Sequence, residues 1–144
     1  MSAMSDFLEN KIIDQLFRGQ AAPTTTTLHV GLLTAAPSDS GGGTEVTGGS
    51  YARVAVTSSL ANWAGTQSAG STVASTGSGG QTSNNAAITF PTPSANWGAV
   101  THFGIYDAAS AGNLLFWGAL TISKTINQAD TVTFPAASLS ITFA

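Results

Sequence analysis

Hydrophobic residues are concentrated in residues 97–120, and their pattern predicts a β-hairpin. Two runs rich in β-branched and aromatic residues flank a connector of small residues that ends in Gly112 and Asn113, which favour tight turns. In the first run Phe103 and Ile105 share one face, but the opposite face carries apolar residues as well. Strands that are apolar on both faces are covered on both sides. We therefore predict that this hairpin is the core on which the rest of the chain packs.

Shorter apolar runs on either side of the hairpin predict further strands. They cover residues 28–34, 51–57, 86–90, 131–134 and 139–143, and residues 121–126 continue the second strand of the hairpin. In the last run Leu139, Ile141 and Phe143 should face the core, because side chains alternate between the two faces of a strand. With turn-rich connections between the runs, the pattern predicts a mainly β fold. We expect an antiparallel β-sandwich of about seven strands with one N-terminal α-helix.

The helix is predicted over residues 5–18, where Ser5 can cap the start and Gly19 follows the end. Its apolar residues cover more than half of the circumference, whereas a helix lying on one sheet needs a stripe of about 100°. We therefore expect contact with two surfaces. The helix either wedges against its own sandwich or docks on another subunit. The residues predicted to make these contacts are Phe7, Leu8, Ile12, Ile13, Leu16 and Phe17.

Residues 64–85 consist almost entirely of Gly, Ser, Thr, Ala, Asn and Gln, with Val73 as the only larger aliphatic residue. A loop of this length inside a compact domain is usually functional or disordered. Because the segment has few apolar side chains of its own, we expect an extended arm or β-ribbon that lies on the rest of the assembly, with Val73 among its contacts. The predicted organisation is a helix over residues 1–19 and one sandwich domain over residues 20–144 that carries this arm or long loop.

Charge is sparse, which bears on the class of partner. Only 8% of the 144 residues are charged, 42% are hydrophobic, and the formal net charge is −3. Weak charge repulsion suits a subunit whose surface is covered by other proteins. The four scattered basic residues form no stripe of the kind that binds nucleic acid. No apolar run approaches the roughly 20 residues that span a bilayer, and the acidic start is unlike a signal peptide, so we expect no membrane partner.

Candidate chemistry is equally sparse. Cysteine is absent, and the two histidines, His29 and His102, lie singly in predicted strands, where a histidine is usually structural. Two pairs of loop carboxylates are candidates for calcium, but neither has the ligand spacing of an EF-hand. They are Asp39 with Glu45 and Asp107 with Asp130. We predict no catalytic residue, no cofactor and no metal site, and therefore no enzyme.

One ion pair is predicted. Glu45 lies in the loop that leads into the strand of Arg53, which makes these two residues the best-placed opposite charges in the chain.

Two tryptophans follow the same dipeptide, because Trp63 and Trp97 each come directly after Ala-Asn. Buried tryptophans in these positions would cap the ends of the sandwich. Exposed ones would suit stacking on a sugar or insertion into a partner's pocket. Both residues are candidate contacts.

Several short motifs occur together along the chain. They are Phe7-Leu8-Glu9-Asn10 with Phe17-Arg18-Gly19, the strand 28–33 followed by Thr34-Ala35-Ala36-Pro37, Gly41-Gly42-Gly43-Thr44-Glu45-Val46 with Gly49-Ser50-Tyr51-Ala52-Arg53, Trp97-Gly98 with Thr101-His102-Phe103-Gly104-Ile105-Tyr106-Asp107, and Gly112-Asn113-Leu114-Leu115-Phe116 with Gly118-Ala119-Leu120. In combination they resemble a family of small bacteriophage structural proteins often described as phage tail-fibre proteins. The resemblance covers most of the chain outside residues 64–85.

The resemblance implies a virion component that is made in the host cytoplasm. Fibres are usually long, repetitive and trimeric, whereas this chain is short and shows no repeat. We therefore expect a capsid decoration (cement) protein that binds the major capsid protein and copies of itself, and so stabilises the assembled head. The alternative is a tail-fibre or tail-tip adhesin that binds a host glycan or surface protein through Trp63 and Trp97.

Overall fold

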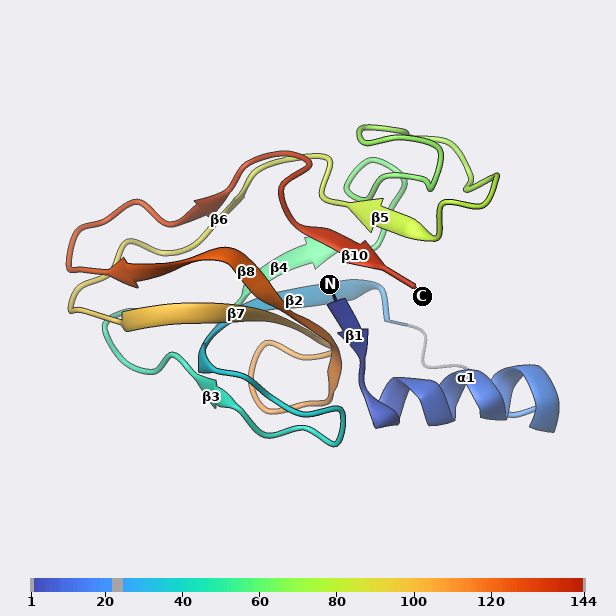
Figure 1. The fold of residues 1–144 in the computed structure, drawn as a ribbon, viewed down its shortest axis with the longest axis horizontal. Helices are drawn as coiled ribbons and strands as arrows, with labels where there is room; N and C mark the ends of the chain where they lie inside the picture. The colour runs from blue at the N-terminus through green and yellow to red at the C-terminus, as the bar shows by residue number, and fades with distance from the viewer. Residues whose placement is uncertain (1, 22–24, 144) are drawn as a thin grey trace.

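The computed structural model describes residues 2–21 and 25–143, and the elements are shown in Figure 1. One helix and ten strands are found in these residues. In chain order they are β1 (Ser2–Met4), α1 (Asp6–Arg18), β2 (Thr27–Ala35), β3 (Thr44–Glu45), β4 (Val54–Thr57), β5 (Gln81–Ser83), β6 (Ile88–Thr89), β7 (Gly98–Tyr106), β8 (Leu114–Ile126), β9 (Thr133–Phe134) and β10 (Ser140–Thr142).

The strands form a sandwich with one large layer and one divided layer. The large sheet has the order β1-β8-β7-β2-β3, with β4 also paired to β2, and the divided layer consists of the pairs β10-β5 and β6-β9. All of these pairs are antiparallel. The core lies between the layers, where Val30 and Ile105 from the large sheet meet Ile88, Leu139 and Ile141. The predicted antiparallel sandwich with an N-terminal helix is confirmed.

The central hairpin is also confirmed. Strand β7 pairs with β8, with Phe103 opposite Gly118 and Ile105 opposite Phe116. Ile105 is fully buried, as expected for a strand that is covered on both faces. The register shifts between Val100, which lies opposite Lys124, and His102, which lies opposite Ala119. Residues 120–123 of β8 therefore bulge against a single residue of β7.

The apolar pattern predicted no strand at β1, β3 or β5, although β5 lies in the segment expected to form an arm or β-ribbon. Each has only two or three residues and lacks the apolar alternation by which a strand is recognised. Backbone pairing to a neighbour holds them instead. Strand β1 precedes the helix and lies on β8, with Ser2 opposite Gly118, so the chain enters the large sheet before α1 begins.

One inward-facing prediction in the last strand is wrong. Leu139 and Ile141 are buried, with 1% and 3% of their surface exposed, but Phe143 is 50% exposed. Strand β10 ends at Thr142, so the alternation no longer directs the next side chain into the core. The ring of Phe143 packs at the surface instead, with its centroid 5.0 Å from that of Phe116.

Residues 64–80 form a projecting loop, which extends beyond the sandwich beside β5 in Figure 1. The loop is held by its own hydrogen bonds, such as those from Thr66 Oγ1 to the Thr76 carbonyl at 2.8 Å and from the Gly65 amide to the Ser71 carbonyl at 3.2 Å. Small hydroxyl and amide side chains satisfy nearby carbonyls in place of a strand ladder. The prediction of an extended β-ribbon therefore holds only for β5, which pairs with β10.

Candidate assembly surface and buried ion pair

The start of α1 is fixed to the sandwich. Ser5 caps the helix by accepting a hydrogen bond from the Leu8 amide, and the Ser5 amide donates to the Leu115 carbonyl at 3.0 Å. The Asp6 amide donates to the Asp39 carbonyl at 2.9 Å. Ser5 is only 2% exposed, so these bonds are shielded from water. The helix is therefore anchored at one end on β8 and the loop that contains Asp39.

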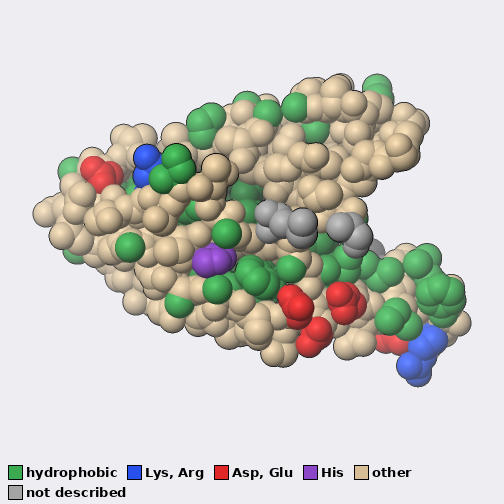
Figure 2. Space-filling model, in the orientation of Figure 1, with side chains coloured by type: hydrophobic (Ala, Val, Ile, Leu, Met, Phe, Trp, Pro, Cys, Tyr) green, Lys and Arg blue, Asp and Glu red, His purple; other side chains and the backbone are tan. Residues whose placement is uncertain are grey.

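The rest of α1 projects from the sandwich, and none of its residues is buried. Ile13, Leu16 and Phe17 are 49%, 69% and 81% exposed, at positions that share one helix face. Hydrophobic side chains are prominent on the visible side of α1 in Figure 2. The sandwich of this chain therefore leaves the face of Ile13, Leu16 and Phe17 uncovered. Contiguous exposed apolar side chains of this size mark interaction sites.

The other six candidate contacts lie in different surroundings. Phe7, Leu8 and Ile12, on α1, are half-buried. Trp97 is 6% exposed, its Nε1 donates to the Gly49 carbonyl at 2.9 Å, and its ring meets the Tyr51 ring edge-on at 5.3 Å. Trp97 therefore caps the core and is not part of the contact surface. Trp63 is half-buried at the base of the projecting loop. Val73, on that loop, is 62% exposed and remains accessible.

The predicted ion pair is confirmed, and it is largely buried, with 24% of the Glu45 side chain exposed. Arg53 Nε and Nη2 donate to the two carboxylate oxygens of Glu45 at 2.8 and 2.7 Å. The side chain of Arg53 is only 7% exposed. Its Nη1 donates to the carbonyls of Ala108 and Ala111 at 2.8 Å each, so the guanidinium also fixes the loop between β7 and β8. Burial lowers the pKa of Arg53, but the bonds and charge of Glu45 outweigh it and the net shift is upward.

Both tyrosines complete this cluster. The Tyr51 hydroxyl donates to Glu45 Oε1 and accepts from the Leu32 amide, both at 2.8 Å. The Arg53 guanidinium lies over the Tyr106 ring, 3.4 Å from its centroid. A Cβ on Gly31 would lie 2.9 Å from Glu45 Oε1, so glycine is needed beneath the carboxylate. The cluster joins β2, β3 and β7 and has a structural role.

The cluster predicts an alkaline limit to stability. Burial raises the pKa of Tyr51 and of Tyr106, and the charge of Glu45 raises each further. Above the ordinary value of 10.0, the unfolded chain releases tyrosine protons that the folded protein retains. Stability then falls with pH, because the native state binds more protons. We expect melting temperatures to be steady near neutrality and to fall above about pH 10.

Thermal melts across pH, with tyrosinate absorbance recorded in parallel, test this expectation. Tyr106→Phe keeps the ring under Arg53 and should make the alkaline fall shallower. Tyrosinate appearing in the folded protein at the ordinary pKa would contradict the prediction.

Of the carboxylates considered as calcium ligands, Asp107 and Glu45 already bind other side chains. Asp107 accepts hydrogen bonds from the amide and the Nδ2 of Asn113, both at 2.7 Å, and Glu45 is held by Arg53. Within residues 2–21 and 25–143, no three His, Asp or Glu side chains gather as a metal site would require. In the same residues, α1 is too short and too polar to be a membrane-spanning helix.

Sequence reasoning missed one important polar residue, Asn84. It is 1% exposed, and its Nδ2 donates to the carbonyls of Ala86 and Pro135 at 2.8 Å each. Its Oδ1 accepts from the Leu139 amide at 2.9 Å. Asn84 therefore joins the chain directly after β5 to the turn before β10. Its position in a run of small polar residues carries no signal of this role.

A family model described as podophage GP4 fiber I protein gp80 matches residues 3–142. No match was found among curated protein sequences. The matched range includes α1, the buried ion pair and the whole of the sandwich from β2 to β10. It therefore supports the tail-fibre resemblance seen in the sequence motifs and implies a structural component of a phage virion. Since the match covers almost the entire sandwich and its helix, the chain belongs to the podophage GP4 fiber I protein gp80 family.

Proposed function

We propose that this protein is a non-enzymatic structural subunit of the tail-fibre apparatus, held in the virion through α1. The observation that carries the proposal is the apolar face of α1, formed by Ile13, Leu16 and Phe17, which the protein's own sandwich leaves uncovered. The match to a family of fibre proteins supports a place in the tail fibre over other places in the virion. The partners are other virion proteins and copies of this chain.

The energetics of α1 support an anchoring role. Full burial of a Leu, Ile or Phe side chain contributes about 2 kcal/mol, and all three members of the apolar face have surface left to bury. Because the cap at Ser5 already holds the start of the helix, α1 loses less conformational entropy when it binds a partner. The sandwich behind the helix carries few charges, which leaves its surface compatible with close neighbours in an assembly (Figure 2).

A capsid decoration protein is the second candidate. The structure of the described residues is one small sandwich, without the elongated repeats of a long fibre shaft. A compact module of this kind suits a protein that binds an assembled shell many times and favours the intact lattice by mass action. In this role α1 would dock on the major capsid protein.

Labelling of virions separates the two candidates. An epitope tag inserted after Gly77, in the exposed loop, leaves the sandwich pairing intact. Gold label at the tail fibres supports the proposal, whereas label spread densely over the head supports the decoration protein. Particles without label, produced by cells that make the tagged protein, would contradict both assignments.

The role of α1 is tested by a double variant, Leu16→Ser with Phe17→Ser. Both side chains are exposed, so the free energy of unfolding should change by less than about 1 kcal/mol. Incorporation into particles should fall by about tenfold or more, because the apolar contact is lost. Quantitative immunoblotting of purified virions measures the effect. The matched control is Asn10→Ser with Gln15→Ser, at exposed polar positions of the same helix, which should leave incorporation unchanged. Normal incorporation of the Leu16 and Phe17 variant would refute the anchoring role.

A further inference from the structure

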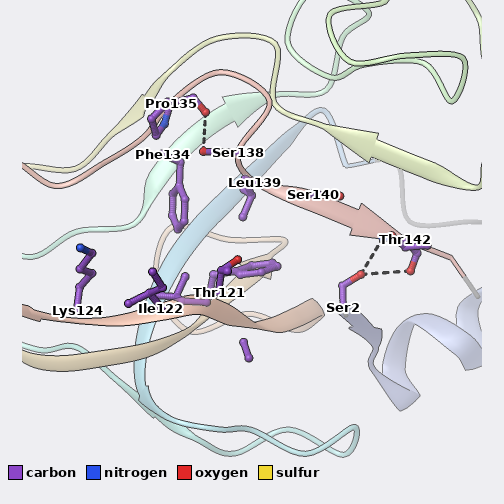
Figure 3. Close-up of a pocket in the computed structure, with 13 residues that line it drawn as sticks. Ser2, Thr121, Ile122, Lys124, Phe134, Pro135, Ser138, Leu139, Ser140 and Thr142 are labelled. Carbon is purple, nitrogen blue, oxygen red and sulfur yellow. Dashed lines mark hydrogen bonds between the residues drawn. The ribbon is translucent and has the colours of Figure 1, made fainter.

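A groove of about 440 Å³ runs between the outer edge of β8 and strand β10 (Figure 3). Apolar side chains from both layers, including Leu120, Phe134 and Leu139, form its floor and wall. Ser2 lies at one end and Lys124 at the other in Figure 3. The groove therefore separates the large sheet from the β10-β5 pair.

The outer edge of β8 is only partly covered. Strand β1 pairs with residues 116–118 of β8 and no further. Within the described parts of the chain, residues 119–125 of β8 have no strand partner on that outer side and no other backbone hydrogen bond. The Leu115 carbonyl accepts from the Ser5 amide on this side, so by alternation the backbone groups of Ala119 also point outward. An uncovered strand edge of this kind is a template for pairing with another chain.

Strand β10 faces the same groove with its backbone. The Thr142 amide donates to Ser2 Oγ at 2.8 Å, and Ser2 Oγ donates to the Thr142 carbonyl at 3.2 Å. The backbone of Thr142 thus points toward β1, while the Leu139 carbonyl accepts from the Asn84 amide on the opposite side. By alternation the backbone groups of Ser140 face the groove as well. Strand β1 pairs with β8, and its Ser2 contacts Thr142 of β10, so β1 closes one end of the groove.

We propose that an extended segment of another virion polypeptide adds to the sheet in this groove. It pairs with the backbone of Ala119 in β8, next to the bulge at residues 120–123, and with Ser140 of β10 on the other side, in line with β1. Main-chain hydrogen bonds supply affinity, and alternate side chains of the incoming strand pack on Leu120, Phe134 and Leu139. The inference rests on the proposed role as a structural subunit and names the kind of partner, but it does not require α1.

Charge indicates the chemistry of the occupant. Lys124 lines the groove and forms no ion pair with any described residue. An incoming strand with a carboxylate at that end would complement it. A second copy of this chain fits poorly, because its strands already lie in ladders, and its projecting loop, residues 64–80, carries no charge and bonds to itself. The partner is therefore an acidic, extended tail or linker of a different protein.

The test uses the full chain and a synthetic ten-residue peptide, acetylated and amidated, in which valine alternates with threonine and one end carries two aspartates. Fluorescence anisotropy should show saturable binding, and hydrogen exchange should slow at the amides of Ala119 and Ser140. Lys124→Glu should weaken binding about fivefold, and a peptide with two lysines in place of the aspartates should restore it. Lys11→Glu, on α1, is the matched control and should bind as the unchanged protein does.

A backbone variant gives a second readout. Ala119→Pro removes the amide that faces the groove, and it should abolish binding while circular dichroism shows a folded sandwich. Absence of saturable binding to both peptides, or protection outside the groove, would overturn the proposal. Slowed exchange at residues 119–125 that grows with protein concentration, without peptide, would place a second copy in the groove and overturn the choice of partner. These measurements use isolated protein, so their failure is distinct from a failure of the virion labelling.

Discussion

Glu45→Gln is expected to lower the free energy of unfolding by about 3 kcal/mol, because it leaves the buried guanidinium of Arg53 without a counter-charge. The Arg53 side chain is 7% exposed and donates two charge-assisted hydrogen bonds to Glu45, so little water can reach the guanidinium to replace the lost carboxylate. The amide of glutamine also presents hydrogen atoms to a group that only donates. Urea denaturation of the variant beside the unchanged protein measures the loss.

The matched control is Asp14→Asn, which removes the ion pair between Asp14 and Arg18 on α1. That pair is longer, at 3.4 Å, and the Arg18 side chain is 70% exposed. Exposed pairs of this kind contribute about 0.5 kcal/mol or less. The contrast between the two variants therefore isolates burial as the cause. Equal, small effects in both would show that the Glu45–Arg53 cluster does not hold the sandwich together.

Asn84→Asp is expected to cost about 4 kcal/mol at neutral pH, although the two side chains have the same shape. The substitution removes the two donors that satisfy the carbonyls of Ala86 and Pro135 and turns a carboxylate oxygen toward them. Asn84 is 1% exposed, so the charge would be buried without a cation. Part of the stability should return in acid, because the protonated carboxyl can donate one hydrogen bond again.

Denaturation of this variant at neutral and at acidic pH tests both statements. Asn10→Asp, at an exposed position on α1, is the control and should change stability by less than about 1 kcal/mol. A small effect of Asn84→Asp at neutral pH would mean that the turn before β10 does not depend on this side chain.

Hydrophobic periodicity alone determined the principal elements. The hairpin of β7 and β8, the strand β2 and the helix α1 were predictable because each has a long, distinctive pattern over nine or more residues. The Glu45–Arg53 pair was predictable for a different reason. With so few charges in the chain, proximity in sequence left little choice of partner.

Only the tertiary structure decided which surfaces are free. The apolar arc of α1 was evident in the sequence, but its exposure depends on where β8 holds Ser5 and in which direction the helix then projects. Trp63 and Trp97 follow the same dipeptide, yet Trp97 caps the core while Trp63 lies half-buried. Identical local sequence cannot distinguish them, because burial is set by distant segments such as Gly49.

The groove beside β8 and the role of Asn84 belong wholly to the fold. Both arise where segments far apart in the chain meet: Ser2 with Thr142, and Asn84 with Pro135 and Leu139. Short strands and buried polar hydrogen bonds produce no hydrophobic periodicity in the sequence. They are stabilised by residues far away in the chain, which a local pattern does not include. The sequence by itself therefore determined a β-sandwich with an amphipathic helix, and the long-range contacts decided where that sandwich offers a surface to other proteins.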